Sequence, residues 1–312
     1  MRNFLFALIS VITINTASAE KLIIATSNRG NFDTTFSEFA LKNGFLDKCD
    51  VDIQHFWSSS GGEAIQAVIA GSADISLAMP YGNALGIYAK GAPIKTIGSS
   101  FIGVDGYWFV KNDSPFKEMK DLEGKRVAFG TFGSIGDIFT RSLQKNSGVN
   151  FERVATGHTM VANYASVMTG QIEAALSAYP TLLDKVASKE IRIIATTKQF
   201  LPERMNISSR IVIAHNNSIA NKRKQIECWA AGVDKAIDYF YNDDKAVIKY
   251  TELVGFSVES VELAKSLIER KQFNIYTLSG EEQAVKDGIE IKALTTPLSE
   301  EQIKSFYIKL SR

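Results

Sequence analysis

The sequence predicts an α/β fold made of two similar units, each an open, mostly parallel sheet with helices on both faces. β-rich apolar runs of strand length alternate with helical patterns, and this alternation occurs twice along the chain. The two series also share an internal similarity. From residue 211 onward the pattern becomes mostly helical. We therefore expect two doubly wound lobes followed by a helical C-terminal part.

The first unit begins with an apolar strand, a polar loop and a helical pattern, which is the first half of a βαβ unit. In order, its expected elements are strand 22–26, helix 32–48, strand 51–57, helix 61–70, strand 74–79, helix 80–90 and strand 94–101.

The second unit follows a short strand at 106–110 and a polar connection at 112–125. In order, its expected elements are strand 126–130, helix 134–145, strand 151–156, helix 160–169, strand 174–178, helix 181–189 and strand 191–196. Amphipathic helices are then expected at 222–241 and 260–271, with a last helix after Ser299.

The internal similarity appears when residues 65–74 are set against residues 164–173. In both copies a helix ends at a glycine, an acidic residue follows three positions later, and an apolar strand closes with a Pro/Tyr pair. Each glycine suits a helix C-terminal cap and each proline a helix start. The alternative is chance similarity between two βαβ units.

The N-terminus predicts export through a cleavable signal peptide at residues 1–19. Arg2 is followed by an apolar run at 4–14 and by the small residues 17–19. This run is shorter than the roughly 20 residues that a membrane-spanning helix needs. Glu20, rather than a lipid-modified cysteine, follows the cleavage point. We therefore expect a soluble periplasmic protein.

The charge balance and the few metal-binding residue types exclude several functions. Without Arg2, the chain has equal numbers of basic and acidic residues and no long run of either sign, which disfavours nucleic acid and anionic lipid as partners. The three histidines and two cysteines show no metal-ligand spacing, and no cofactor motif is present. Cys49 and Cys228 could form a disulfide or remain two buried thiols.

Three segments make the chain resemble the periplasmic solute-binding proteins of ABC importers, in particular the family that serves nitrate, aliphatic sulfonates, taurine and thiamine-pyrimidine precursors. They are residues 67–75 with Pro80, residues 121–134 and residues 167–174. The order and spacing of these segments carry the likeness, because each one alone consists of turn and cap residues.

The resemblance implies a type II periplasmic binding fold, with two lobes joined by two crossing hinge strands and a ligand cleft between them. Residues 20–108 with 211–312 would form lobe one, and residues 109–210 lobe two. The C-terminal helices would pack on lobe one. A small-molecule ligand and the importer permease would be the partners of a protein that we expect to be a monomer.

In open α/β sheets, ligands bind at the carboxyl ends of the strands, so the loops there are the expected site. The candidate ligand-binding residues are Asn28, Arg29, Trp57, Ser59, Ser60, Pro80, Tyr81, Phe132, Gly133, Ser134, His158, Thr159 and Tyr179.

The serines and Thr159 stand near helix starts, where free N–H groups favour an anion. Arg29 could add a bidentate contact, and His158 could donate to a ligand oxygen. The aromatic residues could wall the pocket. The alternatives are ordinary N-caps, solvated loop residues and core aromatics.

These features predict capture of a small organic anion, such as a sulfonate or a taurine-like molecule, by hinge closure without turnover. A heteroaromatic, pyrimidine-type ligand is the alternative. An enzyme resembling the pyrimidine synthases of the same fold is disfavoured, because their cysteine cluster is missing here. The sequence shows neither a nucleophile elbow around Ser134 nor a phosphate-binding loop. It does not separate transport from a sensor role.

Overall fold

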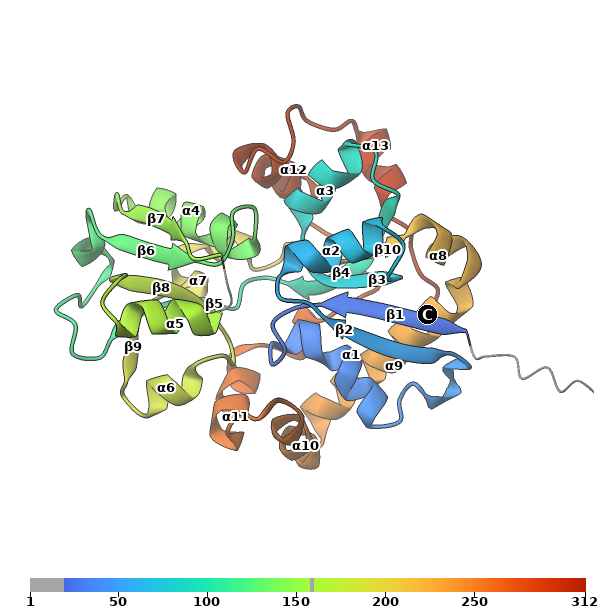
Figure 1. The fold of residues 1–312 in the computed structure, drawn as a ribbon, viewed down its shortest axis with the longest axis horizontal. Helices are drawn as coiled ribbons and strands as arrows, with labels where there is room; N and C mark the ends of the chain where they lie inside the picture. Colours follow the sequence, from blue (N-terminus) through green and yellow to red (C-terminus); the bar gives the residue numbers. More distant parts are fainter. Residues whose placement is uncertain (1–19, 158–159) are drawn as a thin grey trace, which may run out of the picture.

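The computed structural model describes residues 20–157 and 160–312 and contains two α/β lobes, each built on a five-stranded sheet. Figure 1 shows the two sheets side by side, with helices on both faces of each. The α/β class expected from the alternating pattern is confirmed. The segment expected to be a signal peptide lies outside the described residues. Among the residues described, no helix is long and apolar enough to cross a bilayer.

The first sheet has the strand order β2-β1-β3-β10-β4. Its strands are β1 (Lys21–Thr26), β2 (Asp52–Trp57), β3 (Ile75–Pro80), β4 (Ile94–Ile102) and β10 (Ser208–His215). β10 runs antiparallel to both of its neighbours, whereas β1 pairs in parallel with β2 and β3. The helices of this lobe are α1 (Phe32–Lys42), α2 (Gly61–Ile69) and α3 (Tyr81–Ala89).

The second sheet repeats this arrangement in the order β7-β6-β8-β5-β9. Its strands are β5 (Gly106–Lys111), β6 (Arg126–Phe129), β7 (Glu152–Ala155), β8 (Ala174–Ala178) and β9 (Ile191–Thr196). Here β5 is the antiparallel strand. The helices are α4 (Ile135–Ser147), α5 (Met160–Met168), α6 (Leu183–Ala187) and α7 (Thr197–Phe200). Each sheet is thus mostly parallel with one antiparallel strand.

The acidic residue of the internal similarity has the same structural role in both lobes. The Asp74 carboxylate accepts a hydrogen bond from the Ile23 N–H of β1 at 2.8 Å. The Glu173 carboxylate accepts one from the Arg126 N–H of β6 at 2.9 Å. Each carboxylate also pairs with a cation, Lys222 or Arg126. In each lobe the acidic side chain therefore links the turn that follows a helix to the neighbouring strand by a hydrogen bond.

Two connections join the lobes. Residues 103–105 lead from β4 to β5, and residues 197–207 lead back from β9 to β10. The Gly103 N–H donates to the Ile207 carbonyl at 2.8 Å, so the connections lie side by side. The lobe boundaries expected at 108/109 and 210/211 fall inside β5 and β10. We place the crossings just before these strands, because each strand pairs along its length with one sheet.

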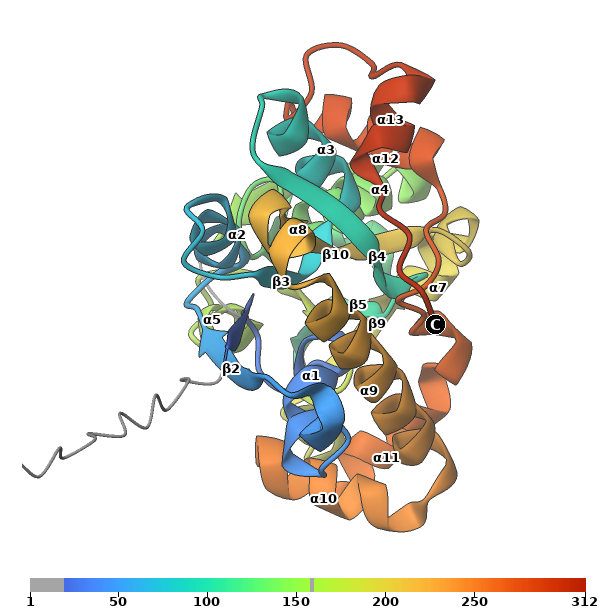
Figure 2. The ribbon, with the colours of Figure 1, turned by 90° about the vertical axis from the view of Figure 1, so that its right-hand side faces the viewer.

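The C-terminal helices pack on lobe one, as expected (Figures 1 and 2). They are α8 (Asn216–Asn221), α9 (Arg223–Asn242), α10 (Asp244–Val254), α11 (Val258–Leu267), α12 (Glu281–Glu290) and α13 (Glu300–Phe306). α9 packs on α1, while α12 packs on α3. At the second contact a Cβ on Gly82 would stand 2.6 Å from the Ala284 carbonyl oxygen, so only glycine permits this approach.

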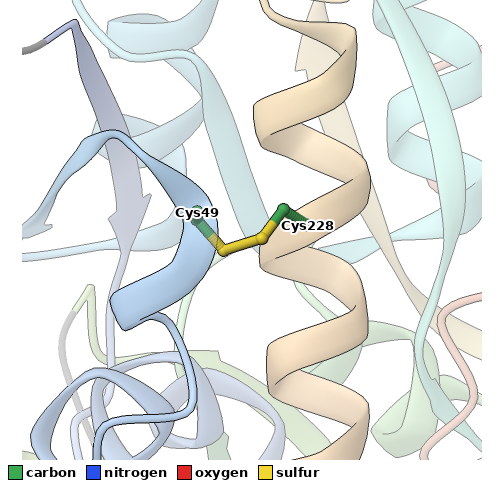
Figure 3. The surroundings of a disulfide bond; sticks show 2 residues. All are labelled: Cys49 and Cys228. Atoms are coloured by element: carbon green, nitrogen blue, oxygen red, sulfur yellow. A yellow bond between two sulfur atoms is a disulfide. The ribbon is translucent and has the colours of Figure 1, made fainter.

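The first helix is shorter than the pattern predicts. It ends at Lys42 rather than near residue 48, because Gly44 adopts a left-handed φ of 77° and turns the chain. A separate 3-10 helix, Asp47–Cys49, follows. Cys49 there forms a disulfide with Cys228 of α9, with 5.4 Å between their Cα atoms (Figure 3). Of the two alternatives left open by the sequence, the structure has the disulfide.

Replacing both cysteines by alanine is expected to lower the free energy of unfolding by about 2–5 kcal/mol, because the disulfide closes a loop between residues 179 positions apart. The melting temperature should fall by roughly 5–15 °C, measured by circular dichroism. Reducing agent should lower the melting temperature of the unaltered protein and leave the double variant unchanged. Equal melting temperatures for the two proteins would contradict this expectation.

A polar contact links β2 to the helices beside the disulfide. Ser37 Oγ of α1 accepts from the Trp229 indole N–H and lies 2.8 Å from His55 Nε2. Burial, aided by the charges of Arg29 and Lys42, lowers the pKa of His55 to about 4. The imidazole of His55 is therefore neutral in the folded protein at pH 7.

Acid is expected to destabilise the protein through His55. Between pH 6.5 and about 4 the unfolded chain binds a proton at this residue and the folded chain does not, so stability is lost as pH falls through this window. The loss reaches about 3 kcal/mol at most. Urea unfolding of His55→Gln and of the unaltered protein at several pH values would test this, since the variant should show a flatter profile. Parallel profiles would refute it.

Candidate functional site

A cavity of about 200 Å³ lies between the two lobes. Residues at the carboxyl ends of β1 and β3 line one side, and residues that follow β6 or end β8 line the other. Parallel strands place their carboxyl ends at the same sheet edge, so the loops of each lobe gather there. The volume suits a small molecule rather than a peptide.

Of the helices that begin at the cavity, α2 and α4 start after a serine, Ser60 and Ser134 respectively. The Ser60 hydroxyl accepts from the Glu63 N–H at 3.2 Å, and the Ser134 hydroxyl accepts from the Asp137 N–H at 3.3 Å. Both serines therefore cap their own helices. The first two N–H groups of each helix have no intrahelical partner and belong to residues that line the cavity, namely Gly61, Gly62, Ile135 and Gly136. These groups can bind an oxyanion.

Three buried charged residues, Arg210, Asp33 and Asp105, line the cavity together, and we call this buried part of the lining its floor. Arg210 donates through Nε to Asp33 Oδ2 at 2.6 Å. Its two terminal nitrogens donate to both oxygens of Asp105, at 2.9 and 2.6 Å. The guanidinium also lies 4.4 Å from the centre of the Phe101 ring. Burial raises the pKa of Asp33, and Arg210 opposes this effect.

Two hydrogen bonds join the lobes across the cavity, away from the crossing segments. Asn83 of α3 donates through Nδ2 to the Gly133 carbonyl at 3.0 Å. The Thr181 hydroxyl donates to Asn31 Oδ1 at 2.9 Å. These contacts require the lobes to be close together. The described structure is thus a closed arrangement.

Seven of the candidate residues line the cavity: Asn28, Ser59, Ser60, Pro80, Phe132, Gly133 and Ser134. Phe132 is 67% exposed, an unusual state for phenylalanine. Arg29 and Trp57 lie elsewhere and contact each other. Arg29 pairs with Glu38 at 2.7 Å, and its guanidinium stands 5.8 Å from the Trp57 ring centre.

Tyr81 and Tyr179 are also outside the cavity lining. Tyr81 is buried, and its ring stacks on Phe306. Tyr179 stacks on Tyr107 at 5.0 Å, and burial raises its pKa to about 12. The side chains of Tyr81 and Tyr179 therefore pack against aromatic neighbours and do not line the cavity. His158 and Thr159 lie outside the described residues.

Three charged lining residues were not expected from the sequence, namely Asp33, Asp105 and Arg210. The sequence does contain a signal for Arg210, because it directly precedes the apolar run 211–214, and a charge buried beside such a run requires a partner. Its partners lie 177 and 105 residues away along the chain. No local pattern shows such pairing. Among residues 20–157 and 160–312, no cluster of His, Cys, Asp and Glu could hold a metal ion.

Removing the Asn83 hydrogen bond is expected to shift the protein toward an open form. One such bond contributes about 1 kcal/mol, so Asn83→Ala should change the ratio of closed to open molecules about fivefold. Small-angle scattering without ligand should show a larger radius of gyration. Asn43→Ala is the matched control, because Asn43 Nδ2 donates a similar bond to the Phe39 carbonyl at 2.8 Å within lobe one. Identical scattering of both variants would contradict the role of Asn83.

A family model described as NMT1/THI5 like matches residues 31–246. A curated protein of Haemophilus influenzae, named "Putative thiamine biosynthesis protein", is 24% identical over 244 residues. The match covers 77% of this chain and 75% of that protein.

Solved structures share the fold. The alkanesulfonate-binding protein SsuA of Xanthomonas axonopodis pv. citri superposes with a TM-score of 0.72 at 17% identity, covering 93% of this chain and 99% of that one. The periplasmic nitrate-binding protein NrtA of Synechocystis PCC 6803 gives 0.70 at 14%, covering 93% and 86%. The Candida albicans CA3427 gene product, described as having the generic periplasmic binding protein fold, gives 0.73 at 18%, covering 93% and 96%. At these identities the likeness establishes the fold alone, and it confirms the fold expected from the resemblance.

Proposed function

The chain belongs to the NMT1/THI5-like family, and from this premise we propose that it is an exported solute-binding protein that delivers a small molecule to an ABC importer. The observation that carries the proposal is a cavity lined by both lobes and closed by hydrogen bonds between them. A ligand held by both lobes stabilises the closed form over the open one. The permease would recognise that closed form.

The proposed ligand contains an oxyanion, such as the sulfonate of a taurine-like molecule. Its support is the four N–H groups at the starts of α2 and α4, which face one cavity from opposite lobes. The proposed contacts are Asn28, Ser59, Ser60, Gly133 and Ser134, with Phe132 and Pro80 as apolar walls. An alkanesulfonate and nitrate are the ligands named for two proteins of the same fold.

A pyrimidine-type ligand is the second candidate. It is favoured by the family description and by the relative named for thiamine biosynthesis. The exposed ring of Phe132 offers a face on which a flat heterocycle can stack.

We propose binding without turnover for either ligand. Both cysteines are joined in a disulfide outside the cavity, so the chain offers no thiol there as a nucleophile. The apolar run at 4–14 supports export to the periplasm, and the expectation of a monomer stays a proposal.

A thermal-shift screen over sulfonates, carboxylates, pyrimidines and amines tests the function. At a concentration about 100-fold above Kd, a true ligand should add about 2.7 kcal/mol and raise the melting temperature by roughly 5–10 °C. Scattering should show compaction in the same samples. A screen without any hit would count against a solute-binding role.

Ser134→Leu should abolish binding of a ligand found in that screen, because the larger side chain occupies the cavity. It also removes a helix cap, at a cost of about 1 kcal/mol. Ser257→Leu is the matched control, since Ser257 caps α11 through the Ser260 N–H at 3.2 Å. Both variants should lose similar stability, and only Ser134→Leu should lose binding. Unchanged affinity in Ser134→Leu would remove α4 from the site.

A further inference from the structure

The floor of the cavity holds an excess of one formal negative charge. Arg210, Asp33 and Asp105 are its charged residues within the described chain, with side chains that are 5%, 2% and 4% exposed. Both oxygens of Asp105 accept from Arg210, and one oxygen of Asp33 does so. No other residue of the described chain donates to Asp33 Oδ1. One guanidinium, that of Arg210, is therefore hydrogen-bonded to two buried carboxylates.

The two other buried charge clusters considered among the described residues do not share this excess of negative charge. Arg204 pairs with the buried Asp287 through two hydrogen bonds, at 2.8 and 2.7 Å, and its second carboxylate neighbour, Glu203 at 4.0 Å, is half exposed to water. Asp137 is paired with both Arg141 and Arg153, an excess of positive charge. A buried carboxylate without its own cation is costly, because the protein interior solvates it poorly. This unfavourable burial of a carboxylate occurs at the cavity floor, where a positively charged group of a bound molecule can compensate for it.

We infer that the captured molecule carries a positively charged nitrogen that lies against Asp33 and Asp105, and that Asp33 is a specificity-determining residue for it. This inference rests on the proposed function and narrows its ligand class. An ammonium or protonated amidine would give the floor a second cation and donate to Asp33 Oδ1, to which no other residue of the described chain donates. An oxyanion on the same molecule would face the N–H groups of α2 and α4, which makes a zwitterion the best match.

The alternative is that Arg210 binds an anion with its remaining N–H groups. A purely anionic ligand at the floor would then meet two carboxylates and one guanidinium. The net repulsion disfavours it, whereas a positive group is attracted by both acids. The two possibilities predict opposite preferences between molecules that differ in a single group.

Matched ligand pairs test the inference on the unaltered protein. Taurine and isethionate differ only in an ammonium against a hydroxyl group, and an aminomethylpyrimidine and its hydroxymethyl counterpart differ in the same way. Calorimetry at pH 7 should show tighter binding of the ammonium member, by about tenfold or more, in the pair that binds. Equal or tighter binding of the hydroxyl member would overturn the inference while leaving the proposed function standing. No ligand across the whole screen would overturn both.

Asp33→Asn then assigns the preference to one residue. The asparagine amide has about the same volume as the aspartate carboxylate, and its oxygen can still accept from Arg210 Nε. Asp105 is then the one remaining carboxylate, paired with the one guanidinium of Arg210. The preference for the ammonium member should fall to about twofold or less. Asp287→Asn is the control, because it alters a buried arginine pair outside the cavity and should leave the preference unchanged. An unchanged preference in Asp33→Asn would overturn the role of Asp33.

Discussion

The buried pairing of Arg210 with Asp33 and Asp105 is the interaction on which the arrangement of the site depends. Arg210 belongs to the returning strand β10, Asp105 to the connection that leaves lobe one, and Asp33 to the first turn of α1. A buried guanidinium must keep its hydrogen bonds, so these three segments have to meet at one point. That point is both the floor of the cavity and the junction of the two lobes.

The two lobes have the same internal architecture. Their strand orders correspond, each with an antiparallel strand in the fourth position. In each, an acidic side chain after a helix accepts an N–H from the neighbouring strand. The carboxyl ends of the strands then face the partner lobe, and the helices that follow begin at the cavity. The repetition explains why N–H groups reach the cavity from both sides.

The lining of the cavity carries polar groups of both kinds. Backbone donors at α2 and α4 favour negative charge, while Asp33 and Asp105 favour positive charge. A sulfonate alone would use only the backbone donors, and a cation alone only the carboxylates.

The sequence by itself determined the two α/β units, the repeated acid and the loops that line the cavity, because hydrophobic periodicity and turn residues are local signals. Ser60, Phe132 and Ser134 were found in this way. It did not distinguish loop residues that face the cleft from those that pack within a lobe, such as Trp57 and Tyr179, since a loop position does not encode the direction of a side chain. Only the tertiary structure decided the charged floor and the disulfide. Arg210 meets Asp33 across 177 residues of sequence, and Cys49 meets Cys228 across 179, and such contacts exist only once the chain has folded.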